Sequence, residues 1–411
     1  MSAPKLRFKE FNNKWKEYNL YEILNLLGGN AFSSKDTSKN GVKWLKIANV
    51  GFGKIKWDVT DYLPSNFLKK YQGYSLTTED IVLTLTRPIL NKELKIAQIT
   101  NADLPALLNQ RVAKLIINEK IVDKKFIFHL LRNRKTVLDI ESSISGTDPP
   151  NLGNNELKKI QVFIPSKSES IKVASFFDGI DKKVQFQKEK VELLKEQKKG
   201  YMQKVFSREL KFKDNNGREY PEWSQHKLGN FSERVTRKNS DLITTRPLTI
   251  SAQHGLIDQV EFFNKTVASK NLTGYYLLNK GEFAYNKSYS NGYPLGAIKR
   301  LEDYESGALS TLYICFTPKD NVNSDFLVHY FDSTQWYKEV SLICVEGARN
   351  HGLLNVSVSE FFDTLHYLPC LEEQLKIAKF FDCINQKIKL NEQTLKNLQD
   401  QKQAFMQQMF I

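Results

Sequence analysis

One stretch of the chain occurs twice, and this duplication limits the possible folds more than any other feature. The residues from Ile164 to Phe206 align without a gap with those from Leu368 to Phe410, at a constant offset of 204. Fifteen of the 43 aligned positions are identical. Self-similarity at a fixed offset indicates a repeated structural unit. The sequence therefore predicts two halves built on one plan, each ending in a copy of this stretch.

Each copy has the pattern of one long helix. Pro165 and Pro369 stand where a helix can begin, acidic residues follow in the first turns, and no further proline interrupts either copy. Apolar residues recur at the a and d positions of a heptad, with polar breaks at matching places, which is typical of a coiled-coil seam. The predicted seam residues, which would also serve partner docking, are Phe177, Ile180, Val184, Val191, Leu194, Lys198, Tyr201, Phe381, Ile384, Ile388, Leu395, Leu398, Lys402 and Phe405.

The order of the chain predicts how the two helices pair. One helix leaves the first half and the other leaves the second half, so seams that bury each other would run antiparallel about an approximate two-fold axis. At about 1.5 Å per residue each helix would be roughly 58 Å long. We expect a rigid spacer between two domains, while an ordinary amphipathic helix folded onto its own domain is the alternative.

The predicted fold class is α+β, with two similar mixed α/β domains separated by two long antiparallel coiled-coil helices. The first half predicts strands near 42–47, 80–86 and 112–117 and a helix over 124–142, bounded by turns. The second half repeats this order, with strands near 246–250, 281–285 and 308–316 and a helix over 324–340. The predicted boundaries are 1–163 for the first domain, 164–206 for the first helix, 207–367 for the second domain and 368–411 for the second helix.

The charge balance favours a polyanionic partner. The chain has 60 Lys and Arg against 46 Asp and Glu, a net charge of +14, which favours nucleic acid over a merely basic soluble protein. All four cysteines lie in the second half without a C-x-x-C pair, so neither a disulfide framework nor a metal site is expected. The start lacks an apolar signal core and no run of 18 apolar residues occurs, so we expect a cytoplasmic protein with no membrane contact.

Motifs of catalysis are missing from the sequence. There is no phosphate-binding loop, no dinucleotide-binding glycine motif and no serine elbow, and the six histidines are scattered. The segment from Asp148 to Asn151 is similar to the D-P-P-aromatic signature of amino-methyltransferases, but Asn151 replaces the aromatic residue that stacks on a flipped base. A proline-rich structural turn is the favoured interpretation.

Candidate DNA-binding residues lie in predicted loops. Arg and Lys suit phosphates or guanine, and Asn and Gln suit the edge of adenine. For any one of them a solvated surface role is the alternative. The candidates are Arg87, Lys92, Lys95, Asn109, Gln110 and Arg111 in the first half, and Gln253, His254, Asn286, Lys287, Tyr289, Asn291, Arg349 and His351 in the second half.

The layout resembles the specificity (S) subunit of type I restriction–modification enzymes. The resemblance rests on two unlike domains, each beginning with a Trp-containing segment and each followed by a copied helix with the pattern P-x-x-x-E-x-x-x-K-[IV]-A-x-F-F-D. The matching residues are Pro165, Glu169, Lys172, Val173, Ala174, Phe176, Phe177, Asp178, Pro369, Glu373, Lys376, Ile377, Ala378, Phe380, Phe381 and Asp382.

The resemblance implies a non-catalytic DNA-recognition subunit. Each domain would be a target-recognition domain that reads one half of a bipartite, asymmetric site in double-stranded DNA. The helices would set the unread gap and dock two methyltransferase (M) subunits, to which motor–nuclease (R) subunits add. No cofactor is then expected in this chain, because S-adenosylmethionine, ATP and Mg would be bound by the partner subunits.

Two other classes of function compete with this interpretation. A self-sufficient DNA enzyme would need a cofactor loop and a complete catalytic motif, which the sequence does not supply. A coiled-coil scaffold without a DNA role would leave the DNA site of any partner independent of residues 25–160 and 230–365.

Overall fold

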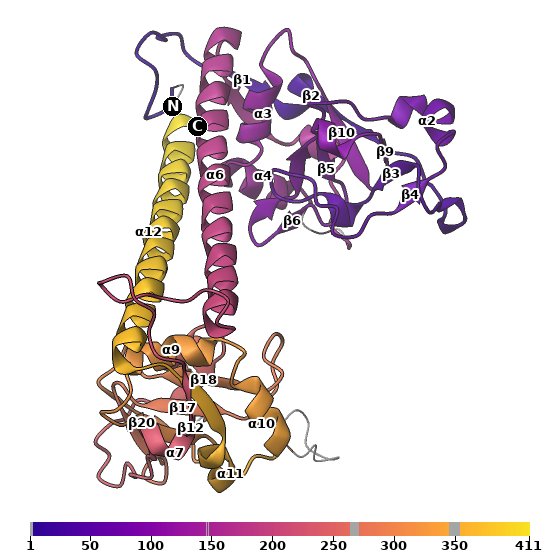
Figure 1. Cartoon of the computed structure of the whole chain (residues 1–411). Helices are drawn as coiled ribbons and strands as arrows, with labels where there is room; N and C mark the ends of the chain where they lie inside the picture. Colours follow the sequence, from indigo (N-terminus) through magenta and orange to yellow (C-terminus); the bar gives the residue numbers. More distant parts are fainter. Residues whose placement is uncertain (1–2, 145, 147, 264–270, 345–353) are drawn as a thin grey trace. The chain divides into compact units, whose positions relative to one another are not determined.

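The computed structural model describes residues 3–144, 146, 148–263, 271–344 and 354–411 (Figure 1). The chain divides into two compact units, unit 1 with residues 1–188 and 393–411 and unit 2 with residues 189–392. Each unit contains one mixed α/β domain and a segment of both long helices, α6 (Lys167–Phe206) and α12 (Leu371–Met409). The predicted fold class is therefore confirmed.

The domain of unit 1 is built on a four-stranded antiparallel sheet in the order β2-β10-β5-β8. β10 covers the same segment, Val112–Ile117, that the sequence predicted as a strand. The main elements are β1 (Lys16–Asn19), α1 (Leu20–Ile23), β2 (Leu24–Gly28), β5 (Ile81–Thr84), β6 (Ile89–Leu90), β7 (Glu93–Leu94), β8 (Ile96–Gln98), β10, α3 (Lys124–Leu130), α4 (Arg134–Ile144), α5 (Asn154–Leu157) and β11 (Gln161–Ile164), which pairs with β1.

Residues 30–76, together with β9 (Ala106–Leu108), form a smaller part of this domain that we call the outer lobe. Its three strands have the order β4-β3-β9, with β3 (Val42–Leu45) antiparallel to β4 (Tyr62–Leu63) and parallel to β9. Its core is aromatic, because Phe32 contacts the ring of Trp44 and the rings of Phe67 and Tyr71, which are the first residue and the C-cap of the short helix α2 (Phe67–Lys70).

The domain of unit 2 repeats the main sheet in the order β13-β20-β17-β18. The helix after the sheet is capped alike in both units, since Asp123 accepts from backbone N–H groups at the start of α3 and Asn323 does so at the start of α9. The elements are β12 (Ser224–Lys227), α7 (Leu228–Phe231), β13 (Ser232–Arg234), β14 (Leu248–Ser251), β15 (Gly255–Asp258), α8 (Gln259–Phe263), β16 (Tyr276–Asn279), β17 (Phe283–Asn286), β18 (Ala297–Arg300), β19 (Ser306–Leu309), β20 (Ile314–Pro318), α9 (Ser324–Asp332), α10 (Tyr337–Ile343), α11 (Val358–Asp363) and β21 (Leu365–Leu368), which pairs with β12.

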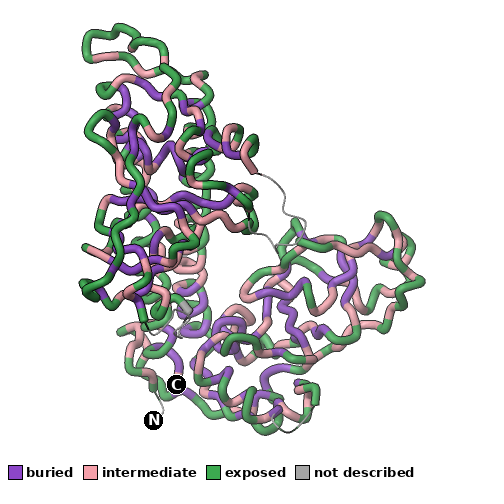
Figure 2. Tube along the Cα trace, turned by 90° about the horizontal axis from the view of Figure 1, so that it is seen from below, coloured by how far each residue is buried: buried purple, intermediate pink, exposed green. Residues whose placement is uncertain are grey.

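The long helices run antiparallel within each unit, as predicted. In unit 1 the first turns of α6 meet the end of α12, and the rings of Phe177 and Phe410 stack with centroids 5.4 Å apart. In unit 2 the end of α6 meets the first turns of α12, and the rings of Phe206 and Phe381 stack at 6.0 Å. Buried residues run through each domain and along the helix segments that close its core (Figure 2).

The segments that lead into the two domains are fixed by equivalent contacts. Leu210 donates its backbone N–H to the carbonyl of Lys204 at the end of α6, at 2.9 Å. The residues 204 positions away do the same in unit 1, where Leu6 donates to the carbonyl of Gln408 at the end of α12, at 3.0 Å.

Three predicted elements differ from the observed ones. The single helices expected over 124–142 and 324–340 are each two helices, α3 with α4 and α9 with α10, and Asn133 at the first break donates its side-chain amide to the carbonyl of Met406 on α12 at 2.6 Å. The strand expected over 308–316 is two strands, β19 and β20, because β19 pairs with β16 while β20 joins the main sheet. Within the part of the chain that the structure describes, we find no helix whose length and apolar character would let it cross a membrane.

Candidate nucleic-acid interface

Several candidate residues of unit 1 gather where β5 ends, a region that we call the β5 edge. It consists of residues 85–95, 109–111 and 150–152, which meet through backbone hydrogen bonds. Leu85 donates to the carbonyl of Arg111 at 2.9 Å, and Arg87 donates to that of Pro150 at 2.8 Å. Because these three segments are fixed to one another, Arg87, Gln110 and Arg111 are presented together, each with an exposed side chain.

A tight hairpin projects from the β5 edge. β6 and β7 are joined by Asn91 and Lys92, whose φ angles are 52° and 65°. Two consecutive residues with positive φ are the signature of the type I′ turn that connects strands most tightly. Arg134 of α4 donates to the carbonyl of Lys92 at 3.1 Å, so the turn that carries the predicted Lys92 is held against the domain.

A hollow of about 640 Å³ opens beside this hairpin. Lys95 lines it but donates its ammonium group to the carbonyl of Ile47 at 2.7 Å, and its pKa is lowered by burial and by the nearby charge of Lys56. The ammonium group of Lys95 is therefore used in a contact within the domain, whereas the side chain of Arg87 is exposed. The lining residues are Ile47, Arg87, Pro88, Ile89, Leu90, Lys95, Glu141, Ile144 and Pro150.

The segment with the D-P-P sequence also lies at this edge. Asn151 accepts a hydrogen bond from the hydroxyl of Thr86 at 3.0 Å, and the two residues form a β-bridge. Leu152 donates to the carbonyl of Leu85 at 2.8 Å. These contacts agree with a structural turn, which is followed by α5 and then by β11, the strand before α6. No group of three or more His, Cys, Asp or Glu side chains in the described ranges could hold a metal ion.

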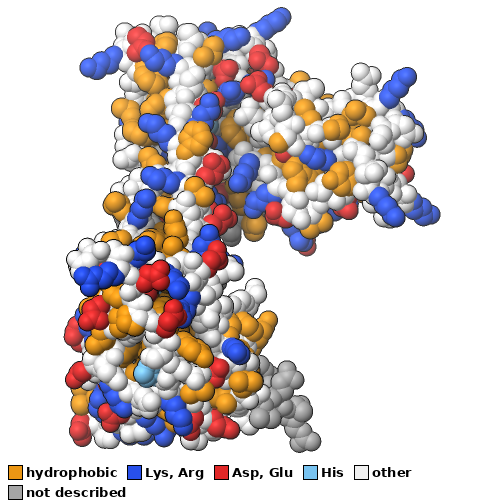
Figure 3. Space-filling model, in the orientation of Figure 1, with side chains coloured by type: hydrophobic (Ala, Val, Ile, Leu, Met, Phe, Trp, Pro, Cys, Tyr) orange, Lys and Arg blue, Asp and Glu red, His pale blue; other side chains and the backbone are white. Residues whose placement is uncertain are grey.

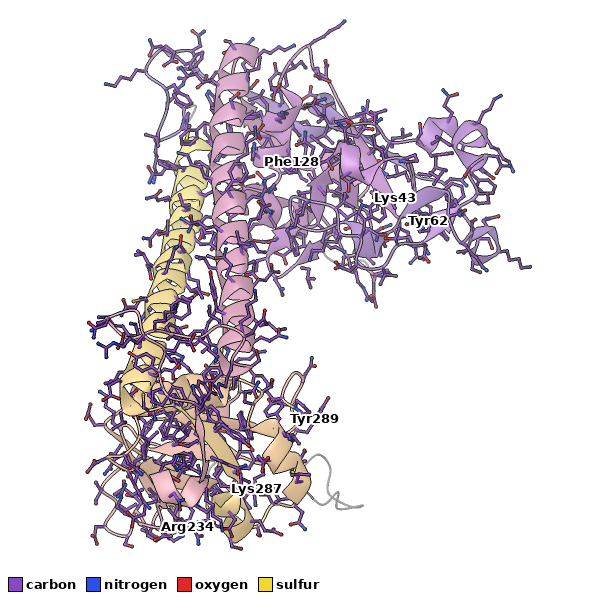
Figure 4. All side chains as sticks on the ribbon, in the orientation of Figure 1. Lys43, Tyr62, Phe128, Arg234, Lys287 and Tyr289 are labelled. Carbon is purple, nitrogen blue, oxygen red and sulfur yellow. The ribbon has the colours of Figure 1, made fainter. Side chains whose placement is uncertain are left out.

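Unit 2 has the equivalent edge at the end of β17, formed by residues 286–296 and by Leu354. Leu354 donates to the carbonyl of Lys287 at 2.8 Å, which repeats the bond between Leu152 and Leu85 in unit 1. We call this the β17 edge. Lys287 and Tyr289 lie on its loop (Figure 4), and Tyr289 and Asn291 are exposed there. Lys287 donates its ammonium group to the carbonyl of Val356 at 3.3 Å, so its side chain is partly engaged.

The other candidates of unit 2 are not brought to this edge. Gln253 and His254 lie in the turn between β14 and β15, and His254 lines a separate hollow of about 140 Å³ with Phe283 and Arg300. Phe283 and Arg300 pair at the start of β17, whereas the β17 edge is at its end. Arg349 and His351 lie outside the described residues.

The outer lobe carries basic residues that sequence reasoning missed. Lysine side chains project from its surface (Figure 3), and Lys43 and Tyr62, which pair across β3 and β4, are shown in Figure 4. Their signal in the sequence was weak, because they are spread over 36 residues and are gathered only by the lobe's fold. The exposed members are Lys35, Lys39, Lys54, Lys56, Lys69 and Lys70.

The predicted seam residues lie along the helix segments with different degrees of burial. Phe177, Val191, Leu194, Phe381 and Ile388 are buried. Tyr201 remains 42% exposed, although the edge of its ring contacts Phe380 at 5.3 Å. The half-buried members are Ile180, Val184, Lys198, Ile384, Leu395, Leu398, Lys402 and Phe405.

Some apolar residues of the helices face outward at matching positions. Phe186 on α6 and Leu390 on α12 are 204 residues apart, and both are 68% exposed. Ile171 and Leu375 are likewise 204 apart and are 46% and 56% exposed. The two repeats therefore expose apolar side chains at matching positions.

Comparison with known proteins gives one consistent family. The Type I restriction modification DNA specificity domain matches residues 12–196. The MjaVIII specificity subunit of Methanocaldococcus jannaschii is 33% identical over 215 residues, which are 52% of this chain and 51% of that protein. The EcoAI specificity subunit of Escherichia coli is 31% identical over 171 residues, 42% of this chain and 29% of that protein. The chain thus spans about half the length, or less, of these relatives.

Solved structures extend the likeness in fold to the whole chain. The S subunit of a type I restriction–modification system from M. genitalium has a TM-score of 0.58 at 16% identity and covers 100% of this chain and 99% of its own. A chain from a study of complex assembly and conformational transition of the type I R-M system has a TM-score of 0.54 at 16% identity, covering 95% of this chain and 96% of its own.

Two mixed α/β domains on a shared pair of long helices therefore define the S-subunit fold. Residues 12–196 match the Type I restriction modification DNA specificity domain, and the chain is similar in sequence to specificity subunits of type I restriction enzymes over about half of its length.

Proposed function

We infer that this chain supplies the DNA sequence specificity of a type I restriction–modification complex, with each domain reading one half of a bipartite, asymmetric site. The observation that carries this proposal is the repetition of one loop edge on two unlike domains. The β5 edge and the β17 edge occupy the same place after equivalent strands, yet their residues differ. Equivalent placement with different side chains suits two recognition surfaces of the same kind that read different bases.

The chemistry of the two edges supports direct reading of bases. Arg87 and Arg111 at the β5 edge can donate two hydrogen bonds to guanine, and Asn291 at the β17 edge can pair with adenine. The apolar wall of the hollow beside Pro88 suits a thymine methyl group or a sugar face. The lysines of the outer lobe would contact phosphates, which supply affinity without sequence information.

The helices are proposed to set the unread gap and to dock two methyltransferase subunits. The matching outward pairs, Ile171 with Leu375 and Phe186 with Leu390, support this role because a repeated surface fits two copies of one partner. Methylation, translocation and cleavage would then belong to the M and R subunits, which would bind S-adenosylmethionine, ATP and Mg, in a cytoplasmic complex.

A domain exchange tests the proposal. Residues 25–160 would be replaced by the equivalent region of a relative, and the methylated motif would be determined by methylome sequencing of cells that also carry the partner methyltransferase. We expect one half of the motif to change and the other half to stay. A change in both halves would contradict the two-module arrangement, and no change in either would favour a scaffold. Binding of S-adenosylmethionine to the isolated chain would favour a self-sufficient enzyme.

A further inference from the structure

Each unit has a largely buried lysine at the same heptad position of its helix pair. Lys198 on α6 and Lys402 on α12 are 204 residues apart, and their side chains are only 21% and 18% exposed. Burial lowers the pKa of both ammonium groups. A half-desolvated charge needs a partner of opposite sign, and each lysine has one.

In unit 1 the partner carboxylate comes from the helix. Asp181 of α6 binds Lys402 through one oxygen, and its other oxygen accepts from Arg132 at 2.7 Å. Burial alone would raise the pKa of Asp181, but Arg132 and Lys402 together hold it below its ordinary value. Arg132 follows α3 and so belongs to the domain. Here one helix acid is shared by a helix lysine and a domain arginine.

In unit 2 the partner carboxylate comes from the domain. Asp332, the last residue of α9, binds Lys299 of β18 at 2.6 Å and lies 4.0 Å from the ammonium nitrogen of Lys198. The helix position equivalent to Asp181, 204 residues later, is Asn385, which is uncharged.

Arg132 and Asp332 occupy equivalent places, which a pair of histidines establishes. His129 of α3 bonds to Asp178 of α6 at 2.8 Å, and His329 of α9 bonds to Asp382 of α12 at 2.9 Å. Arg132 and Asp332 each follow their histidine by three residues. The charge at this domain position is therefore reversed between the units.

The two clusters contain the same charges in a different distribution. Each has two cations around one carboxylate, but the acid is on the helix in unit 1 and on the domain in unit 2. A domain moved alone onto the helix segment of the other unit would therefore meet the wrong charge. A domain with Arg132 beside Lys198 and Asn385 would bring two cations together without a carboxylate bonded between them, because the nearby Asp382 is already bonded to the domain histidine. The contact between domain and helix would then be weakened by repulsion in a poorly screened site.

We propose that this exchanged acid matches each domain to its own helix segment, so that the two recognition domains are not interchangeable between the two places in the chain. Asp181 binds Arg132 and so holds the first domain to the first half of α6. Asn385 is uncharged and does not repel Asp332, the acid that the second domain supplies. The inference does not depend on the DNA-reading proposal, because it concerns only the contact between domain and helix.

A double-mutant cycle in the full chain tests the matching. Arg132→Asp places a second carboxylate beside Asp181, and Asp181→Asn leaves Arg132 and Lys402 without an acid. We expect each single variant to lower the thermal unfolding midpoint by about 3 °C or more. The double variant places the acid on the domain, as in unit 2, although it has no counterpart of Lys299. It should recover most of this loss because the carboxylate introduced by Arg132→Asp can take over Lys402. Additive losses in the double variant would overturn the proposal.

A transplanted domain provides the second test, with a rescue in the helix. Residues 25–160 would replace 230–365, with and without Asn385→Asp. We expect the chimera to unfold at a lower temperature than the natural chain and Asn385→Asp to raise its midpoint. The matched control is Asn385→Asp in the natural chain, which should gain nothing because Asp332 is already there. Equal stabilisation in chimera and control, or none in either, would refute the matching.

Discussion

Trp15 donates its indole N–H to Glu169 at 3.2 Å, and this buried carboxylate also accepts two hydrogen bonds from Arg7. The same place in unit 2 has Trp223 and Glu373, at 3.1 Å, but among the described residues it lacks an arginine bound in this way. Burial raises the pKa of Glu373, which is the expected result for a carboxylate without a close counter-ion. Two sites at equivalent positions of the repeat thus differ in charge balance.

This difference predicts unequal costs for the same substitution. Glu169→Gln leaves Arg7 beside a neutral group in a largely buried place, so we expect a loss of about 3 kcal/mol in unfolding free energy. Glu373→Gln keeps the hydrogen bond of Trp223 and should cost about 1 kcal/mol or less. Urea unfolding of the two full-length variants measures both, and equal losses would contradict the prediction.

His366 predicts a loss of stability in mild acid. It is buried between the hydroxyl groups of Tyr330 and Thr364, at 2.9 and 2.8 Å, and burial lowers its pKa to about 4. As the pH falls below about 6.5, the unfolded chain takes up a proton that the folded chain refuses until about pH 4. We expect this residue to lower the unfolding free energy by about 2 kcal/mol between pH 7.5 and pH 5.

The variant His366→Gln should flatten this part of the pH dependence. His226→Gln is the matched control, because His226 pairs with His366 across β12 and β21 and is not fully buried. An unchanged acid slope in His366→Gln would show that other groups, such as the buried His129 and His329, dominate.

At the β5 edge, Arg87→Ala and Arg111→Ala should weaken DNA binding by the assembled complex about tenfold or more and relax the motif at one base position. Lys120→Ala is a suitable control, since Lys120 follows β10 at the end of the sheet opposite to Arg111. Binding titrations at fixed salt, together with methylome sequencing, distinguish base contacts from phosphate contacts. Equal effects of Arg111→Ala and Lys120→Ala would argue against the β5 edge.

The outward apolar pairs predict where the methyltransferase subunits bind. Phe186→Lys and Leu390→Lys should each weaken one of two binding events by about tenfold, because each buries a charge in an apolar contact. Gln197→Lys adds the same charge to an exposed polar position of α6 and should have little effect. Native mass spectrometry of the complex reports the number of bound subunits, and full occupancy in both variants would exclude these residues.

The gap between the half-sites should follow the length of the helices. Seven residues inserted after Lys190 and again after Thr394 keep the heptad phase in both helices and add about 10 Å. We expect a longer unread gap or loss of activity, and four residues inserted near Lys190 alone should do the same by shifting the register. Full activity on the original motif would contradict a spacer role.

The sequence allowed the helices and the repeat order to be predicted because their information is local. The heptad of α6 and α12 needs only neighbouring residues, and the strand over Val112–Ile117 is a short run of apolar and β-branched residues. The break before α4 escaped prediction because apolar residues such as Val137 and Ile140 continue the helical period, while Asn133 bonds to Met406, 273 residues away.

The candidate site was predictable only in part. Arg87 and Arg111 were named from their loops, but their proximity depends on the pairing of β5 with β10. The outer lobe depends on the parallel pairing of β3 with β9, some 60 residues apart, which no local pattern reveals. The reversed charges at Arg132 and Asp332 were hidden because the offset between the halves changes from 204 to 200 there.

The bond from Leu6 to Gln408 has a consequence for the order of the halves. The equivalent bond in unit 2 joins Leu210 to Lys204, which are only six residues apart in the chain. The same contact therefore forms whether or not the backbone connects the helix end to the segment that follows it. In unit 1 the hydrogen bond from Leu6 to Gln408 therefore holds together two segments that are not joined by the backbone. A permuted polypeptide that opens between Phe206 and Leu210, and joins Ile411 to Leu6 through residues 3–5, should keep both of these contacts while the order of its two α/β domains along the chain is reversed.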